Sequence, residues 1–195
     1  MGWSKPSNLP GEGAPPLPIR ALNADLATFT VDTDAASAQE IRAAVRHWEE
    51  SNGCVAARVF RTARPIVEED LSVALLQSLR LECLQGAGAR DIRASRIPPH
   101  QAVNILFSAT AAGGVYGPSL LGAYGRLAAW RSLGGLVGAT AGASIESIAG
   151  LAHRCLWASF DASSEWSYDV AWDHGLLAIR PDGLSFAVLA ATDTD

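Results

Sequence analysis

The last third of the chain consists largely of short apolar runs separated by turn residues. These runs occupy residues 152–160, 166–172, 176–180 and 184–192. Runs of this length, bounded by Gly, Asp and Pro, are typical of β-strands. Between the last two runs, the segment 180–183 places Pro at the second turn position and Gly where a positive φ is required. The pattern predicts a four-stranded antiparallel meander that contains a tight hairpin.

Helical spacing of apolar residues dominates the first half of the chain. Asp34 is a suitable N-cap for a helix over residues 36–50, and a strand is predicted over residues 54–61. A second helix follows Pro65, and a third runs from Pro99 to about residue 112. The apolar stripes of the first two helices consist of Ile41, Val45 and Trp48, and of Leu71, Leu75, Leu79 and Cys83.

Glycine is concentrated in residues 113–150, which hold ten of the 18 glycines. Gly134, Gly138 and Gly142 are spaced by four, which on a helix leaves a groove that a neighbouring backbone can approach closely. Each Gly costs a soluble helix up to about 1 kcal/mol. We therefore expect this segment to be packed against a neighbour or partly broken into turns.

These elements predict an α+β fold, with the N-terminal and central helices packed on one face of the C-terminal antiparallel meander. The Pro-rich residues 1–22 are expected to form a disordered or extended arm, and residues 23–195 a single domain. The other face of the sheet, with Trp157, Asp169 and Asp173, is where a polar site is expected. The residues predicted to face the helices are Trp166, Tyr168, Val170, Trp172, Phe186 and Val188.

Charge and cysteine content narrow the function classes. The net charge is -5, and from Asp161 onward seven acidic residues stand against one base, Arg180, which disfavours nucleic-acid binding. No run is long and apolar enough for a membrane span, and no secretory signal opens the chain. The cysteines, widely spaced and without a CxxC pair, predict no zinc site, no disulfide framework and a reducing cytoplasm; they are Cys54, Cys83 and Cys155.

A symmetric first hairpin would place His153 opposite Asp173, within reach of an imidazole–carboxylate hydrogen bond. A carboxylate that orients an imidazole is the usual support for a general base, so this pair is the candidate catalytic dyad. An ordinary polar pair or a slipped register is the alternative. His174 forms a second pair with Asp173 only in a turn, and Cys155 is more typical of a small buried hydrophobe than of a nucleophile.

A cluster of aromatic residues and arginines lies in the nearly uncharged central region. Arginines in apolar surroundings need an anionic partner, either a carboxylate of the protein or a ligand. We expect the acids of the meander to supply it, through Asp161, Asp169, Asp173 or Asp193. His47 and His100 have no metal-ligand spacing and are expected to be structural or exposed. The cluster consists of Tyr116, Tyr124, Arg126, Trp130 and Arg131.

Several short sequence segments within residues 100–195 resemble segments of other proteins. They include residues 104–109, residues 113–116, residues 122–132, and the ending with Ala171-Trp172-Asp173 and residues 190–195. These segments resemble an actinobacterial protein family of unknown function, which agrees with the Ala-, Gly- and Arg-rich composition. The resemblance implies no catalytic residue and no cofactor.

Two hypotheses about function remain from the sequence. The first is a protein with a pocket for a small molecule. If His153 and Asp173 act there as acid and base, the protein is an enzyme that needs no cofactor and no metal. The second is a non-enzymatic interaction module of regulatory or immunity type, or a homo-oligomer, whose aromatic residues and arginines bury in a partner. The predicted ligand-binding residues are Tyr116, Tyr124, Arg126, Trp130, Arg131, Trp157, Asp169, Trp172 and His174.

Overall fold

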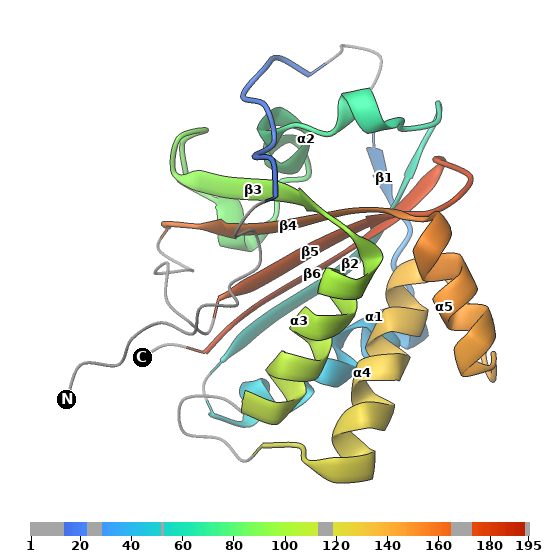
Figure 1. The fold of residues 1–195 in the computed structure, drawn as a ribbon. Coiled ribbons are helices and arrows are strands. Elements are labelled where there is room, and N and C mark those ends of the chain that lie inside the picture. Colours follow the sequence, from blue (N-terminus) through green and yellow to red (C-terminus); the bar gives the residue numbers. More distant parts are fainter. Residues whose placement is uncertain (1–13, 23–28, 52, 113–118, 165–172, 194–195) are drawn as a thin grey trace.

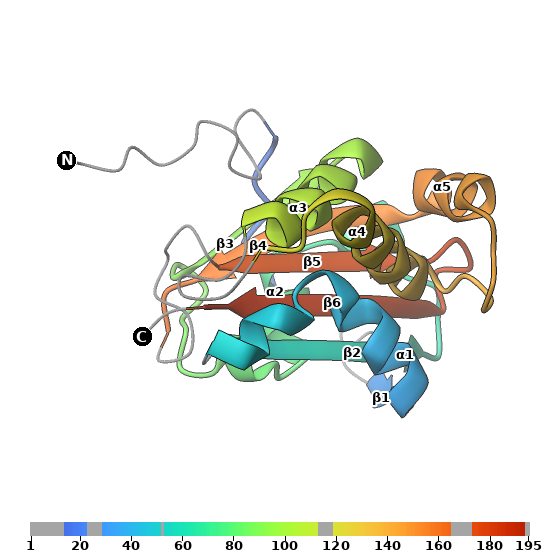
Figure 2. The same ribbon diagram turned by 90° about the horizontal axis from the view of Figure 1, so that it is seen from below.

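A computed structural model of the protein describes residues 14–22, 29–51, 53–112, 119–164 and 173–193. As predicted, the fold is α+β: helices pack on a six-stranded antiparallel sheet (Figures 1 and 2). The strand order is β1-β2-β6-β5-β4-β3. The strands are β1 (Phe29–Val31), β2 (Cys54–Thr62), β3 (Ile92–Ile97), β4 (Leu156–Ala162), β5 (His174–Ile179) and β6 (Ser185–Thr192).

Helices cover one face of this sheet, which we call the helix face. Figure 2 shows α1, α3, α4 and α5 on this side, while α2 and a short 3-10 helix, η5 (Glu82–Leu84), lie on the opposite side, the α2 face. A second 3-10 helix, η3 (Arg46–Ser51), precedes β2. The α-helices are α1 (Ala35–Ile41), α2 (Val73–Ser78), α3 (Pro99–Ala112), α4 (Gly122–Val137) and α5 (Ile145–Arg154).

Local sequence signals predicted several elements correctly. The third predicted helix coincides with α3, and the predicted strand at 54–61 coincides with β2 and pairs directly with β6. Asp34 caps α1 by accepting a hydrogen bond from the backbone N–H of Ser37. The predicted hairpin joins β5 to β6, and its Gly183 has the required positive φ of 67°.

Two predicted helices are broken in the structure. The chain over 36–50 is helical only to Ile41 and then tightens into 3-10 turns. The second helix divides into a 3-10 turn, α2 and η5, because Arg80 takes a positive φ of 50° between α2 and η5. Tertiary packing overrides the helical periodicity here. The predicted stripe residues are nonetheless buried: Ile41, Val45, Trp48, Leu71, Leu75, Leu79 and Cys83.

The predicted pairing of the first meander hairpin is wrong. Residues 152–154 belong to α5, so the apolar run that begins at residue 152 mixes the end of a helix with a strand. Strand β4 pairs with β5 on one side and with β3, which was not predicted, on the other. Both hydrogen-bonding edges of β4 are thereby occupied. The predicted strand at 166–172 lies outside the described residues.

The predicted assignment of sheet faces is wrong for three described residues. Trp157 is 1% exposed under the helices, whereas Phe186 and Val188 belong to the apolar cluster of the α2 face. The alternation separated Trp157 from Phe186 and Val188 correctly, but Asp173, which was grouped with Trp157, lies on the α2 face. It did not reveal which face the helices cover, because apolar layers cover both.

The N-terminal segment at residues 14–18 lies along the outer edge of β3. Leu17 donates its backbone N–H to Ala94 at 2.8 Å, and its side chain is buried on the α2 face. Pro16 forms an isolated bridge with Ser95. This segment therefore covers a sheet edge that would otherwise be open to pairing with another chain.

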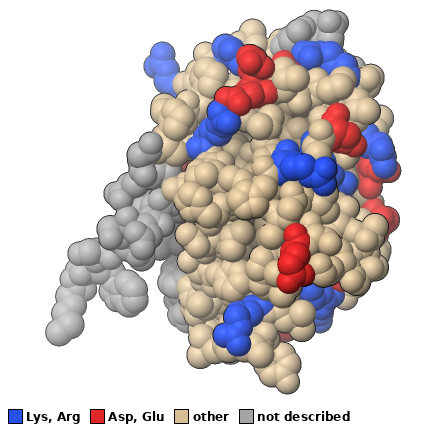
Figure 3. Space-filling model, turned by 45° about the vertical axis from the view of Figure 1, so that its right-hand side comes forward, with Lys and Arg blue, Asp and Glu red and all other residues tan. Residues whose placement is uncertain are grey.

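Ion pairs are scattered over the surface. Acidic and basic side chains alternate on the face shown in Figure 3, with no large cluster of one sign. Within the described ranges, none of the helices has the combination of length and apolar character that a bilayer crossing requires. The pairs include Arg42–Glu49, Arg58–Glu82, Arg61–Asp32, Arg64–Asp70, Arg96–Glu68 and Arg131–Glu40.

Arg180 ties the end of α4 to the β5–β6 hairpin. Its guanidinium donates to the carbonyl oxygens of Gly135 at 3.1 Å and Leu136 at 3.3 Å, which lie in the last turn of the helix. Gly138 ends α4 with a φ of 72°, and a Cβ at this position would lie 2.7 Å from Arg180 Nε. The predicted glycine groove is thus interrupted: Gly138 is a helix cap, and Gly142 lies in the following turn.

We predict that Gly138→Ala lowers the free energy of unfolding by about 1 to 3 kcal/mol, because alanine is strained at positive φ and displaces Arg180. The matched control is Gly150→Ala in α5, where φ is ordinary and no atom lies within 4 Å of the new Cβ. There the change should stabilise the protein by up to about 1 kcal/mol. Urea unfolding measures both values. Equal effects of the two substitutions would contradict the role assigned to Gly138.

Candidate functional site

Polar side chains gather at one end of the sheet, where β4 and β6 end and β3 and β5 begin. The antiparallel register brings them together, because Arg93 pairs with Asp161 and His174 pairs with Ala191. The 3-10 helix η3 packs over this end through Trp48, whose ring lies 5.6 Å from that of His174. We call this group the polar end of the sheet; it comprises His47, Trp48, Arg93, Asp161, Asp173, His174, Thr192 and Asp193.

On the helix face, Arg93 and Asp161 form a two-pronged ion pair. The guanidinium donates from Nε at 2.9 Å and from Nη2 at 3.0 Å to the two carboxylate oxygens. This hydrogen-bonded carboxylate raises the pKa of Arg93. Phe160 pairs with Gly175, so Asp161 and His174 are the next opposed residues in the register. A charged pair therefore stands beside the histidine.

His174 is a half-buried neutral imidazole whose Nδ1 atom is shielded from water. Burial lowers its pKa to about 4, although the charges of Asp173 and Asp161 act in the opposite direction. Among the residues that the structure describes, none forms a hydrogen bond with its shielded Nδ1 atom. Buried polar atoms nearly always have a partner from the protein, a water or a ligand. The Nδ1 atom of His174 is thus an available hydrogen-bonding group.

His47 repeats this arrangement on the other side of Trp48. Its ring lies 6.3 Å from the indole, and the residue is 5% exposed. Burial lowers the pKa of His47, while the charges of Glu50 and Asp193 oppose the shift. Neither ring nitrogen has a hydrogen-bond partner within the described part of the chain. The indole is therefore flanked by the buried imidazole of His47 and the half-buried imidazole of His174.

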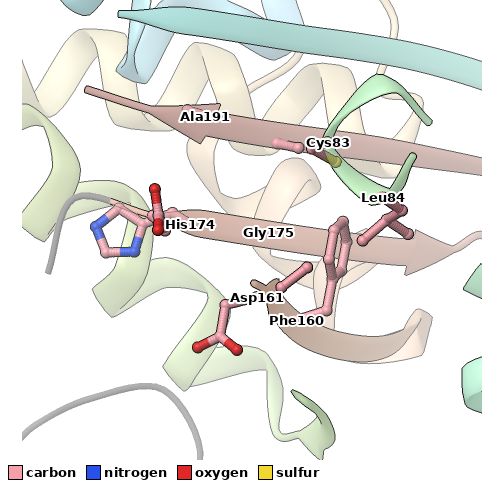
Figure 4. Close-up of a pocket in the computed structure, with 10 residues that line it drawn as sticks. Cys83, Leu84, Phe160, Asp161, His174, Gly175 and Ala191 are labelled. Atoms are coloured by element: carbon pink, nitrogen blue, oxygen red, sulfur yellow. The ribbon is translucent and has the colours of Figure 1, made fainter. Parts of the chain in front are cut away.

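On the α2 face, Asp173 accepts a hydrogen bond from the hydroxyl of Thr192. Gly175 follows, and a Cβ there would lie 2.4 Å from the carbonyl oxygen of Phe160, so only glycine fits. A hollow of about 10 Å³, room for roughly one water, is lined by residues that include Cys83, Phe160 and Asp173. Figure 4 shows Phe160 and Leu84 close together on one side of this hollow, with the imidazole of His174 directed away from them.

The predicted catalytic dyad does not assemble. His153 is exposed in the last turn of α5, and Asp173 is buried immediately before β5. Strand β4 separates them, a distance of roughly 20 Å at the usual rise per residue. The prediction assumed that 152–160 was one strand paired with 166–172, and the true β4 instead pairs with β5.

Two further candidate side chains have structural surroundings. Trp157 donates its indole N–H to the carbonyl of Ala152 at 2.9 Å inside the helix-face core, which removes it from the predicted site. Burial raises the pKa of Cys155 to about 12, and burial does the same for Cys83. Neutral thiols of this kind are poor nucleophiles. Cys155 is thus a small buried hydrophobe, as favoured from the sequence.

The predicted cluster of aromatic residues and arginines does not converge on one point. Arg131 pairs with Glu40 of α1, and not with an acid of the meander as expected. Trp130 packs edge-on against Phe107, with 6.2 Å between ring centroids. Tyr124 and Arg126 are exposed on α4. The remaining predicted ligand residues, Tyr116, Asp169 and Trp172, lie outside the described residues.

The sequence indicated His174, Asp173, Asp161 and Asp193 as candidate site residues. It did not indicate which side chains surround them. Trp48 was assigned to a helical stripe, and nothing local indicated that it reaches the start of β5. Strand β3 was not predicted, so Arg93 could not be paired with Asp161. Among the described residues no group of three His, Cys, Asp or Glu side chains could hold a metal ion. What the polar end offers is carboxylates beside neutral imidazoles, a set that binds hydrogen-bond donors.

Comparisons with known proteins place the chain in a family without assigning an activity. A family model described as a family of unknown function, DUF6183, matches residues 4–195, and the chain therefore belongs to that family. The match extends well beyond residues 100–195, on which the resemblance rested. Comparisons with curated proteins and with solved structures find no match.

We predict that His174 makes the protein less stable as the pH falls. Below about pH 6.5 the unfolded state takes up a proton at this side chain, whereas the folded state takes it up only near pH 4. The free energy of unfolding should fall across this window by up to about 1.4 kcal/mol per pH unit. Urea unfolding between pH 7 and pH 5 should show a shallower slope for His174→Gln. An unchanged slope would contradict a buried neutral imidazole.

Proposed function

We propose that this protein, a member of a family without an assigned activity, binds a small polar ligand at the polar end of the sheet. The observation that carries the proposal is the shielded Nδ1 atom of His174, which has no hydrogen-bond partner among the described residues. The charges of two carboxylates act on this imidazole, that of Asp161 on β4 and that of Asp173 immediately before β5. A ligand that completes these hydrogen bonds gains more than it would in water, because an unpaired buried group costs about 1 to 3 kcal/mol.

A binding role fits the geometry better than catalysis. The His153–Asp173 dyad is not assembled, and the thiols of Cys83 and Cys155 are held neutral. An imidazole whose pKa is about 4 is a weak base at neutral pH.

The test is native mass spectrometry beside denaturing mass spectrometry. We expect wild-type protein to retain a small molecule that denaturation releases, and His174→Gln to lose it. His153→Gln is the matched control, since this histidine is exposed at the other end of β4. Retention that survives His174→Gln, or wild-type protein that carries no added mass after purification at neutral pH, would reject the proposal.

A second candidate function has its own observation. Three large apolar side chains are exposed at the N-cap and in the first half of α4, which extends away from the sheet in Figure 1. Leu121 is 68% exposed, Tyr124 80% and Leu127 58%. Exposed apolar patches on a protein surface mark interaction sites. This surface would serve the interaction or oligomerisation module considered from the sequence.

We predict that Leu127→Glu weakens any self-association by about tenfold, because a carboxylate must then be buried in the contact. Light scattering during size-exclusion chromatography at two protein concentrations measures it. Gln39→Glu, at an exposed position of α1, adds the same charge elsewhere and should have no effect. A wild-type monomer at all concentrations would exclude the homo-oligomer.

A further inference from the structure

We propose that the outer edge of β3 is a docking site for an extended peptide segment of a partner protein, and we call it the β3 docking site. The chain's own N-terminal segment, residues 14–18, occupies this site in the structure. The partner segment that fits carries a leucine and has a backbone N–H two residues before it. Because the site does not use the histidines of the polar end, the inference goes beyond the proposed function.

The N-terminal segment shows how a peptide binds at this edge. Leu17 donates its backbone N–H to the carbonyl oxygen of Ala94 at 2.8 Å. The backbone N–H of Arg96 in turn donates to the carbonyl oxygen of Pro15 at 3.3 Å. The side chain of Leu17 is 8% exposed and belongs to the apolar cluster of the α2 face. Main-chain hydrogen bonds to a sheet edge, together with a side-chain anchor, are the features of peptide recognition by strand addition.

A contact outside the sheet fixes the direction of the bound segment. The carbonyl oxygen of Pro18 accepts a hydrogen bond at 3.1 Å from the backbone N–H of Val73, the first residue of α2. The residue that follows the leucine therefore lies next to α2, while the residues before it run along β3. A segment that ran the other way would place its leucine and this carbonyl oxygen in different positions, so the site selects one orientation.

Few contacts hold the N-terminal segment in place. Leu17 is the only buried residue in the described range 14–22, and the three prolines and residues 19–21 are exposed. Within residues 15–18 the prolines lack an N–H, so Leu17 supplies the only backbone donor. Segments with few buried apolar contacts and few hydrogen bonds open locally, at a much lower free energy than global unfolding. A competing peptide can therefore reach the β3 docking site while the rest of the protein remains folded.

The N-terminal segment cannot complete the hydrogen bonds of the edge at Arg96. The bridge between Pro16 and Ser95 is antiparallel, which places Pro15 opposite Arg96. Two opposed residues of a hydrogen-bonded pair exchange two N–H···O bonds. The bond from the Arg96 N–H is present, but the reciprocal bond to the Arg96 carbonyl oxygen cannot form because Pro15 has no N–H. A partner segment with any other residue at this position gains that bond.

This missing bond favours a partner protein over a second copy of the chain. A second copy carries the same Pro15 and forms no hydrogen bond that the resident segment lacks. The resident segment also has the higher effective concentration, because it belongs to the same chain as the site. Only a segment with stronger contacts displaces it, and an N–H in place of Pro15 provides one such contact.

The test titrates synthetic peptides of residues 14–20 into the full-length protein by isothermal titration calorimetry. One peptide has the natural sequence, a second carries Pro15→Ala, and a third carries both Pro15→Ala and Leu17→Asp. In full-length Leu17→Asp protein the resident segment is released, because a carboxylate does not enter the apolar cluster. The matched control protein is Ile19→Asp, which adds the same charge at a side chain that is 63% exposed.

We expect the Leu17→Asp protein to bind the Pro15→Ala peptide at least about tenfold more tightly than the wild-type and Ile19→Asp proteins do, because no resident segment competes. The natural-sequence peptide should bind about threefold to tenfold more weakly than the Pro15→Ala peptide, which is the effect of one hydrogen bond. The third peptide should not bind. Equal affinity of the wild-type and Leu17→Asp proteins, no binding to folded Leu17→Asp protein, or equal affinity of the first two peptides would overturn the proposal.

Hydrogen exchange of the wild-type protein tests the same site without a substitution. The N–H of Arg96 points toward the N-terminal segment, and successive residues of a strand direct their N–H groups to opposite sides, so that of Ser95 points toward β4. We expect the Arg96 amide to exchange at least about tenfold faster than the Ser95 amide. Equal protection of the two amides would show that the segment does not open on its own and would overturn the proposal. Wild-type dimers that Leu17→Asp abolishes would assign the site to a second copy and overturn the partner protein.

Discussion

Strand β6 is buried along its whole length, and the layers on both sides of the sheet follow from this burial. All eight of its residues are buried, with Ala187, Leu189 and Ala191 toward the helices and Phe186, Val188 and Ala190 toward the α2 face. A central strand with two apolar faces requires cover on both. The helices supply one layer, and α2 with η5 and the N-terminal segment supplies the other. The small side chains toward the helices allow α4 to pack close to the sheet.

Because apolar layers occupy both faces, polar chemistry is confined to the ends of the strands. One end is taken by Arg180, which binds the terminal carbonyls of α4 and so fixes the helix layer on the sheet. At the other end Asp161 of β4, His174 of β5 and Asp193 after β6 gather near His47 and Trp48 of η3. One end of the sheet is therefore structural, and the other is where we place the ligand.

The same burial that makes the polar end a candidate site makes it costly for the fold. Trp48, His47 and the Nδ1 atom of His174 are shielded from water, and both imidazoles stay neutral at neutral pH. A buried donor or acceptor that lacks a partner reduces stability. A ligand that formed hydrogen bonds with these imidazoles would relieve this cost, so we expect ligand binding and fold stability to be linked.

Short-range features are what the sequence by itself determined. The cap at Asp34, the bounds of α3, and the turn that ends at Gly183 depend on backbone geometry and on hydrogen bonds between near neighbours. A period of two also separated Trp157 from Phe186 across the sheet. Only the tertiary structure decided which face the helices cover, that β3 pairs with β4, that Arg131 binds Glu40, and that Trp48 reaches His174. These contacts join residues far apart in the chain, and local periodicity carries no information about them because packing energy alone selects the partners.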